Sequence, residues 1–198
     1  MQELENISSL IISQLKEWGE ILTDFETKNK YSIQTPEGRE LFLAAEDNSR
    51  GFLYRILLRH RRGWTIHIYD KQEQKVLTLE KPFRWFFDEL SIFDQNRTLI
   101  GKVSWKFNLF FKEYVIKNAT HSFIFKISGP LWRPWTFRIY LKNREVGVIT
   151  KKWSGLGKEL FTKADNFVLK FPLDATIEHK ILLLGAAFLI DFNYFEKA

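Results

Sequence analysis

Cysteine is absent from this 198-residue chain, and its absence excludes several kinds of site at once. A protein without thiols has no disulfide framework, no thiol nucleophile and no thiolate metal ligand, which is typical of a reducing compartment. Only five prolines occur, and 45% of the residues are hydrophobic and 16% aromatic. This composition excludes a largely disordered chain and predicts one globular domain over residues 1–198.

A targeting signal is also not readable. The sequence begins Met1-Gln-Glu-Leu-Glu-Asn6, without a basic stretch followed by an apolar core. Neither a secretory signal nor a transit peptide is therefore predicted, and we expect a cytoplasmic location.

Acidic residues are unevenly distributed. Residues 1–27 carry a net charge of about −5, so the remaining chain carries about +11 although the total is only +6. A domain this basic attracts polyanions such as anionic lipid or nucleic acid, and a solvated basic surface is the simpler alternative.

The N-terminal segment has the periodicity of an amphipathic helix. Apolar residues recur every three or four positions at Leu4, Ile7, Ile11, Leu15, Trp18, Leu22 and Phe25. The pattern predicts a helix over residues 3–23. Its acidic polar face favours packing against the basic remainder of the protein or a partner.

From residue 30 to residue 172 the period changes to two, which predicts about a dozen short strands. Turn signals at 35–38, 70–71, 94–96, 117–118 and 142–143 leave no room for helices between them. So many antiparallel strands need a sandwich or a closed barrel to protect their edges.

The C-terminal element is different in kind. Residues 181–190 have no polar side chain, which predicts a helix over 175–195 that is buried on all sides. The stretch between Lys180 and Glu196 spans about 22 Å, shorter than the roughly 30 Å of a bilayer core, and it contains Asp191 and Asn193. We therefore expect this helix to thread the β-barrel rather than to span a membrane. Asp174 and Glu178 suit its N-terminus.

Residues for covalent catalysis are not recognisable. The four histidines show no short ligand spacing, and no serine lies in a nucleophile-elbow context. We expect a protein that is not an enzyme and that has no zinc.

Seven segments, in order along the chain, resemble those of the phospholipid scramblase family of the Tubby-like superfamily. They are 24–31, 41–46, 79–82, 125–130, 164–167, 171–174 and 184–192. The resemblance implies the Tubby-like fold, a closed barrel of twelve antiparallel strands around a hydrophobic C-terminal helix. It also implies a protein that binds anionic phospholipid at the inner face of the plasma membrane and moves phospholipids between leaflets.

This sequence departs from the family in three ways. We expect a short form without the proline-rich N-terminal extension of those relatives. The loops that carry palmitoylation-competent cysteines in animal scramblases correspond here to 84–87, 109–111 and 131–135, which are rich in aromatic residues. The acidic segment that binds calcium in the family is reduced to Asp165, Asn166 and Asp174, with Lys163 in place of its first aspartate. Because calcium needs six to eight oxygen ligands, we expect at most weak binding.

Two sets of residues are candidates for membrane contact. The predicted membrane-inserting residues are Trp85, Phe86, Trp132 and Trp135, while Phe87 and Phe111 are expected to point inward. The predicted lipid-phosphate ligands are Arg55, Arg59, Arg61, Arg62, Arg84, Arg133, Lys151 and Lys152. The alternative is a soluble scaffold whose basic loops hold a protein or nucleic acid, although no recognition helix or RNA-binding motif supports nucleic acid.

Overall fold

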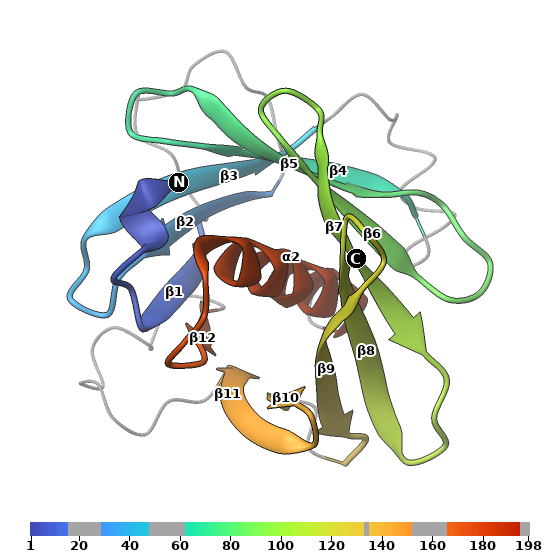
Figure 1. The fold of residues 1–198 in the computed structure, drawn as a ribbon. Helices are drawn as coiled ribbons and strands as arrows, with labels where there is room; N and C mark the ends of the chain where they lie inside the picture. The colour runs from blue at the N-terminus through green and yellow to red at the C-terminus, as the bar shows by residue number, and fades with distance from the viewer. Residues whose placement is uncertain (16–28, 48–61, 133–134, 152–165, 195–198) are drawn as a thin grey trace.

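The computed structural model describes residues 1–15, 29–47, 62–132, 135–151 and 166–194. Twelve strands in these residues form a closed barrel around one α-helix (Figure 1). The strands are β1 (Ser9–Gln14), β2 (Lys30–Gln34), β3 (Glu40–Glu46), β4 (Trp64–Tyr69), β5 (Lys75–Lys81), β6 (Glu89–Asp94), β7 (Leu99–Lys106), β8 (Phe111–Asn118), β9 (Phe123–Pro130), β10 (Thr136–Leu141), β11 (Arg144–Thr150) and β12 (Asn166–Lys170). The helix is α2 (Ile177–Tyr194), and a 3-10 turn, η1 (Gln2–Leu4), precedes β1.

The barrel has the simplest connectivity. Each strand pairs antiparallel with the strands before and after it, and β1 pairs with β12, with Ile11 opposite Val168, to close the ring. Because strand direction alternates, the connections after the odd-numbered strands β1 to β11 all lie at one end of the barrel, which we call the long-loop end. The connections after the even-numbered strands lie at the other end, which we call the hairpin end.

Tight turns at the hairpin end follow from the local sequence. An Asp or Asn side chain accepts backbone N–H groups two or four residues further on in three of them, at Asp70, Asp94 and Asn118. In the β10–β11 hairpin, Lys142 and Asn143 both have positive φ, as a type I′ turn requires. The turns predicted from the sequence are therefore confirmed.

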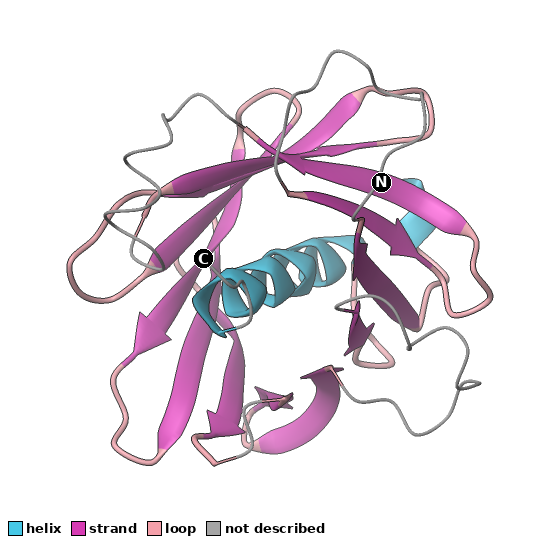
Figure 2. Cartoon of the chain, turned by 180° about the vertical axis from the view of Figure 1, so that it is seen from behind, coloured by secondary structure: helices cyan, strands magenta, loops and turns pink. Residues whose placement is uncertain are grey.

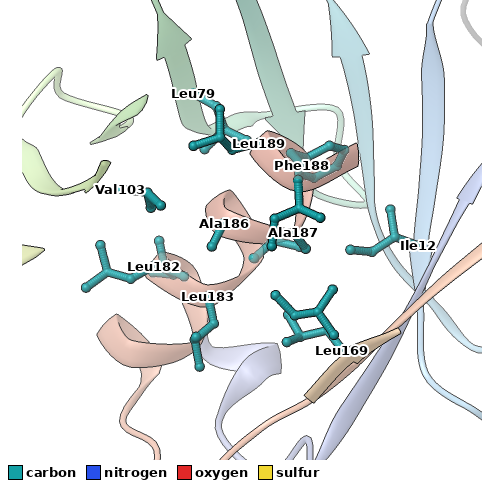
Figure 3. Close-up of a cluster of buried hydrophobic side chains, with 14 of the residues drawn as sticks. Ile12, Leu79, Val103, Leu169, Leu182, Leu183, Ala186, Ala187, Phe188 and Leu189 are labelled. Carbon is teal, nitrogen blue, oxygen red and sulfur yellow. The ribbon is translucent and has the colours of Figure 1, made fainter. Parts of the chain in front are cut away.

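The helix α2 fills the barrel interior, as the view from behind also shows (Figure 2). Side chains on all sides of the helix, including Leu182, Leu183, Phe188 and Leu189, are at most 1% exposed. They meet inward-facing residues of many strands, among them Val103 (Figure 3). Burying each large apolar side chain stabilises the fold by about 1.5–3 kcal/mol, so the helix is the centre of the core. Among the described residues, no helix is long and apolar enough to cross a membrane.

The start of α2 differs from expectation in its cap. Thr176, rather than Asp174, accepts the backbone N–H of His179, at 3.2 Å, while Asp174 is exposed two residues earlier. Lys180 then fixes the helix to the N-terminal turn, because its Nζ donates to the carbonyl oxygens of Leu4 at 2.7 Å and Glu5 at 2.6 Å.

The predicted N-terminal helix is wrong over residues 3–15. A 3-10 turn and strand β1 occupy this stretch, and residues 16–23 of the prediction lie outside the described residues. Leu10 and Ile12 face the core, and Ile11 between them is also buried. The alternation of apolar and polar residues that marks a strand is therefore absent from this part of the sequence. The barrel consequently begins at Ser9 instead of residue 30, because β12 and β2 both need β1 as their partner.

Candidate functional site

Three neighbouring connections at the long-loop end carry most of the exposed large apolar side chains. These connections are 82–88 between β5 and β6, 107–110 between β7 and β8, and 131–135 between β9 and β10. Because β6 pairs with β7 and β8 pairs with β9, the three connections follow one another around the barrel mouth. Because strand direction alternates, three segments that are about 20 residues apart in the sequence lie at the same end of the barrel.

The four residues predicted to insert into a membrane all lie on these connections. The exposed fractions are 63% for Trp85, 74% for Phe86, 69% for Trp132 and 45% for Trp135. Further exposed side chains beside them are Phe87, Phe107, Leu109, Phe110, Phe111 and Leu131. We call this whole set the aromatic rim. A contiguous exposed apolar surface of this kind is uncommon on soluble proteins and marks an interaction site.

Ring contacts hold the aromatic rim together. Phe87 lies against Trp105 of β7 with centroids 5.7 Å apart, and Trp105 lies 6.4 Å from Phe107. Phe111 contacts Trp132 at 6.2 Å, which joins the second connection to the third. The rim is therefore a connected apolar surface rather than a set of independent loops.

The expectation that Phe87 and Phe111 point inward is wrong. They are 54% and 39% exposed, because both lie at the barrel mouth where the strands end, and α2 already fills the interior below them. Phe107, which we did not single out from the sequence, joins the rim for the same reason. Its signal was an aromatic residue directly after the strand-like stretch that ends at Lys106.

Cations beside the aromatic rim are engaged with acidic residues. Arg84 lies 3.1 Å from Glu89, and Lys102 lies 3.1 Å from the same carboxylate. Burial tends to raise the pKa of Glu89, but hydrogen bonding and the charges of Lys102 and Arg84 outweigh it and hold this pKa below its usual value. Arg84 remains 44% exposed, so its guanidinium is accessible to a phosphate as well.

The densest predicted basic cluster is only partly described. Arg55, Arg59 and Arg61 lie outside the described residues, as do Arg133 and Lys152. Lys151 lies at the end of β11, with its Nζ 4.7 Å from the ring centroid of Phe167. The backbone N–H of Lys151 donates to the backbone carbonyl of Trp135 at 2.9 Å. This hydrogen bond fixes the third connection of the rim to the end of β11.

Arg62 does not belong to an exposed basic surface. Its residue exposure is only 9%, and its guanidinium is paired with Glu46, which is 1% exposed. The second carboxylate oxygen accepts from Asn29 at 2.7 Å, and the Arg62 carbonyl accepts from Lys81 at 3.2 Å. Arg62 therefore joins β3, β4 and β5 in a buried polar network.

The three predicted calcium ligands do not form one group in the described structure. Asn166 is buried at the start of β12, at the long-loop end, whereas Asp174 is exposed beyond its other end. The extended β12 separates them by more than about 13 Å, so they cannot share an ion. Asp165 lies outside the described residues, and within the described part no three His, Asp or Glu side chains come together as metal ligands.

Comparison with known proteins identifies the relatives of this chain. A family model described as Scramblase matches residues 1–197. Phospholipid scramblase 1 of Homo sapiens is 35% identical over 211 residues, which cover 100% of this chain and 66% of that protein. Phospholipid scramblase 2 of Bos taurus is 34% identical, covering 99% and 71%. The chain thus spans about two thirds of the length of these relatives.

A solved structure shows the same fold. The X-ray structure of a protein from Arabidopsis thaliana matches with a TM-score of 0.55 over 98% of this chain and 96% of that chain, at 13% identity. At this low identity the comparison supports only a shared fold, not a shared function. The closed antiparallel barrel around a C-terminal helix, predicted from the sequence, is confirmed.

Proposed function

Because the chain belongs to the scramblase family, we propose that it binds anionic phospholipid membranes through the aromatic rim and moves phospholipids between leaflets. It does so as a peripheral protein at the inner face of the plasma membrane, without covalent catalysis. The observation that carries this proposal is the exposure of Trp85, Phe86 and Trp132 at one end of the barrel.

The chemistry of the rim suits the headgroup region of a bilayer. Tryptophan rings prefer the boundary between headgroups and acyl chains, where Arg84 beside them meets lipid phosphate. Each ring that leaves water contributes up to about 2 kcal/mol, and each nearby cation about 1 kcal/mol at an anionic surface. Several rings acting together are sufficient for membrane binding without a lipid anchor.

The geometry of the barrel supports an end-on orientation. All three aromatic connections project from the long-loop end, and the exposed Arg84 lies on the first of them. The rings and this guanidinium would then meet the same membrane plane, with the barrel axis close to the membrane normal.

Lipid movement, in this proposal, comes from the rim and not from α2. Thirteen residues of the 18-residue helix are buried inside the barrel. Rings inserted among headgroups disturb lipid packing locally, and the cations beside them offer phosphate groups a polar path. Both effects leave the barrel closed.

Liposome flotation tests the membrane contact. We expect the wild-type protein to float with anionic vesicles more than with neutral ones, with binding weakened at high salt. The combined change of Trp85, Trp132 and Trp135 to serine is expected to abolish flotation without lowering the thermal midpoint. Phe123→Ser is a matched control, because this ring is 52% exposed but lies at the hairpin end.

Two results would contradict the proposal. Equal flotation of the triple variant and the wild type would exclude the aromatic rim as the membrane contact. Reduced thermal stability of the triple variant with unchanged flotation would mean that the rings serve the fold. Dithionite quenching of labelled lipid in proteoliposomes, with and without calcium, then measures whether lipid movement depends on the same three tryptophans.

A further inference from the structure

A separate cavity of about 500 Å³ opens at the hairpin end, opposite the aromatic rim. It lies between the β10–β11 hairpin, the β12–α2 connection and the first turn of α2. Its lining includes Phe125, Leu141 and Val146 on one side and Pro172 and Leu173 on the other. The volume falls within the range of about 300–1,000 Å³ that is usual for ligand sites.

The cavity exists because β11 and β12 separate. Their pairing covers Val148 to Thr150 and ends opposite Lys170. The next residue, Phe171, donates its N–H at 2.9 Å to the carbonyl of Ser8, so the chain follows the β1 side instead of continuing along β11. In the described structure, no strand pairs with residues 144–146 on this side, which leaves an open strand edge beside the cavity.

An open edge of this kind is a template for another strand. Its backbone N–H and C=O groups need partners, and an extended peptide supplies them by adding to the sheet. The three residues 144–146 match a peptide of three or four residues at about 3.3 Å per residue. A polypeptide segment therefore fits this edge better than a compact small molecule does.

Apolar side chains surround the mouth of the cavity. Of the lining residues, Leu173 is 98% exposed and Leu141 is 41% exposed. Leu173 contributes almost nothing to the core, and a leucine held in water at the edge of an apolar cavity is typical of a surface that a partner covers.

The charged residues that line the cavity indicate the charge of its partner. Arg144 and Lys170 are exposed at its wall. The adjacent Glu145 is paired with Arg138 at 2.5 Å, so Asp174 is the carboxylate that opposes them. The balance is basic, which favours an acidic peptide.

We propose that this cavity is a docking site for an extended acidic segment of a partner protein. The segment adds to the edge of β11 at residues 144–146. One apolar side chain of the segment enters the cavity toward Phe125 and Leu141, and its carboxylates pair with Arg144 and Lys170. This site is independent of the aromatic rim, so the protein holds a membrane at one end and a protein partner at the other.

Fluorescence anisotropy with defined peptides tests the proposal. The probe is a fluorescein-labelled Asp-Leu-Glu-Leu-Asp peptide, and the charge-reversed probe is Lys-Leu-Lys-Leu-Lys. We expect the acidic probe to bind at least about tenfold more tightly than the basic one. Two further probes carry backbone N-methyl groups on alternate amides, in the two possible phases. Strand addition uses one set of alternate amides, so one phase should lose binding and the other retain it.

Protein variants locate the binding. Arg144→Glu and Leu173→Asp are each expected to weaken the acidic probe by about tenfold, and both change exposed side chains, so the fold is preserved. Lys71→Glu makes the same charge change in an exposed turn at the same end and should leave affinity within about twofold. Near-ultraviolet circular dichroism checks that each variant is folded.

The contrary outcomes are distinct. No binding up to about 1 mM, equal binding of acidic and basic probes, or equal binding of both N-methylated probes would overturn strand addition by an acidic segment. Equal weakening by Lys71→Glu and Arg144→Glu would reduce the effect to general charge. Liposome flotation of Arg144→Glu should remain normal, which separates this site from the membrane contact.

Discussion

Replacing Gly185 with alanine tests whether α2 occupies the barrel interior, because the two possible surroundings of the helix predict opposite signs. Alanine in an unobstructed helix is more favourable than glycine by about 0.8–1.0 kcal/mol. A helix in water or lipid should therefore become more stable. Inside the barrel, a Cβ atom added at residue 185 would clash with Cδ1 of Ile92 on β6 and would lie 3.0 Å from its Cγ1.

The magnitude follows from the balance of these two effects. Ile92 is fully buried, so its side chain has little room to move away, and rotation of Cδ1 leaves Cγ1 in place. Overpacking of a core typically costs about 1–3 kcal/mol. After subtraction of the gain in helix propensity, we expect Gly185→Ala to lower the free energy of unfolding by about 1 kcal/mol. For a chain of this length the midpoint of thermal unfolding falls by about 2–4 °C.

Urea unfolding followed by tryptophan fluorescence provides the measurement, and a second variant makes it specific. Ile92→Val removes the methyl group that obstructs residue 185, and alone costs about 0.5–1.5 kcal/mol. Because valine keeps Cγ1 but lacks Cδ1, alanine should destabilise the double variant less, giving a favourable coupling energy of at least about 0.5 kcal/mol. A rise in stability on Gly185→Ala, or an absence of coupling with Ile92→Val, would refute the packing of α2 against β6.

Three other outcomes are expected, two of them from described residues and one for the predicted calcium segment. Glu46→Ala should destabilise the protein by about 3–5 kcal/mol in urea unfolding, because it leaves the buried Arg62 guanidinium without its carboxylate, whereas Glu145→Ala in an exposed pair should cost less than about 1 kcal/mol. Burial lowers the pKa of His67, so stability should decline as the pH falls below about 6.5, where the unfolded chain takes up a proton and the folded chain does not. The stability of the His67→Gln variant should decline less over the same fall in pH. Calorimetry should find calcium binding only at millimolar concentration or not at all, and a micromolar affinity lost in Asp165→Ala would contradict this.

Local periodicity explains why most of the barrel was predictable. Buried residues alternate with more exposed ones along strands such as β4, β9 and β10, and the turn residues act within a few positions of themselves, as at Lys142 and Asn143. Strand β1 was not predicted because Ile11, between Leu10 and Ile12, is buried as they are, so buried and exposed residues do not alternate there. The spacing of its apolar residues then fitted a helix equally well.

The exposure of a candidate site residue was predictable only where it depends on the local sequence alone. Exposure of Trp85 and Trp132 follows from rings placed in turns, whereas exposure of Phe87 depends on where β5 and β6 leave the barrel. Arg62 reads as part of a basic run, yet its partner Glu46 lies 16 residues earlier and becomes adjacent only because β3 pairs with β4. Long-range pairing of this kind has no local signature.

The position of α2 also constrains how this protein can act on a membrane. Its last turn is joined to the barrel mouth by a Phe192–Trp64 contact at 4.6 Å and a hydrogen bond of 3.3 Å from Asn193 to the Tyr114 hydroxyl.

A lipid phase could solvate the extracted helix, but the inward-facing side chains of the strands would then lose their core. With each large side chain contributing about 1.5–3 kcal/mol, extraction exceeds the whole stability of a typical domain, about 5–15 kcal/mol. Removing α2 is thus equivalent to unfolding the barrel. We therefore expect any movement of lipid to occur with the barrel closed, and disruption of lipid movement by the tryptophan changes at the rim, with α2 unaltered, is the result that this reasoning requires.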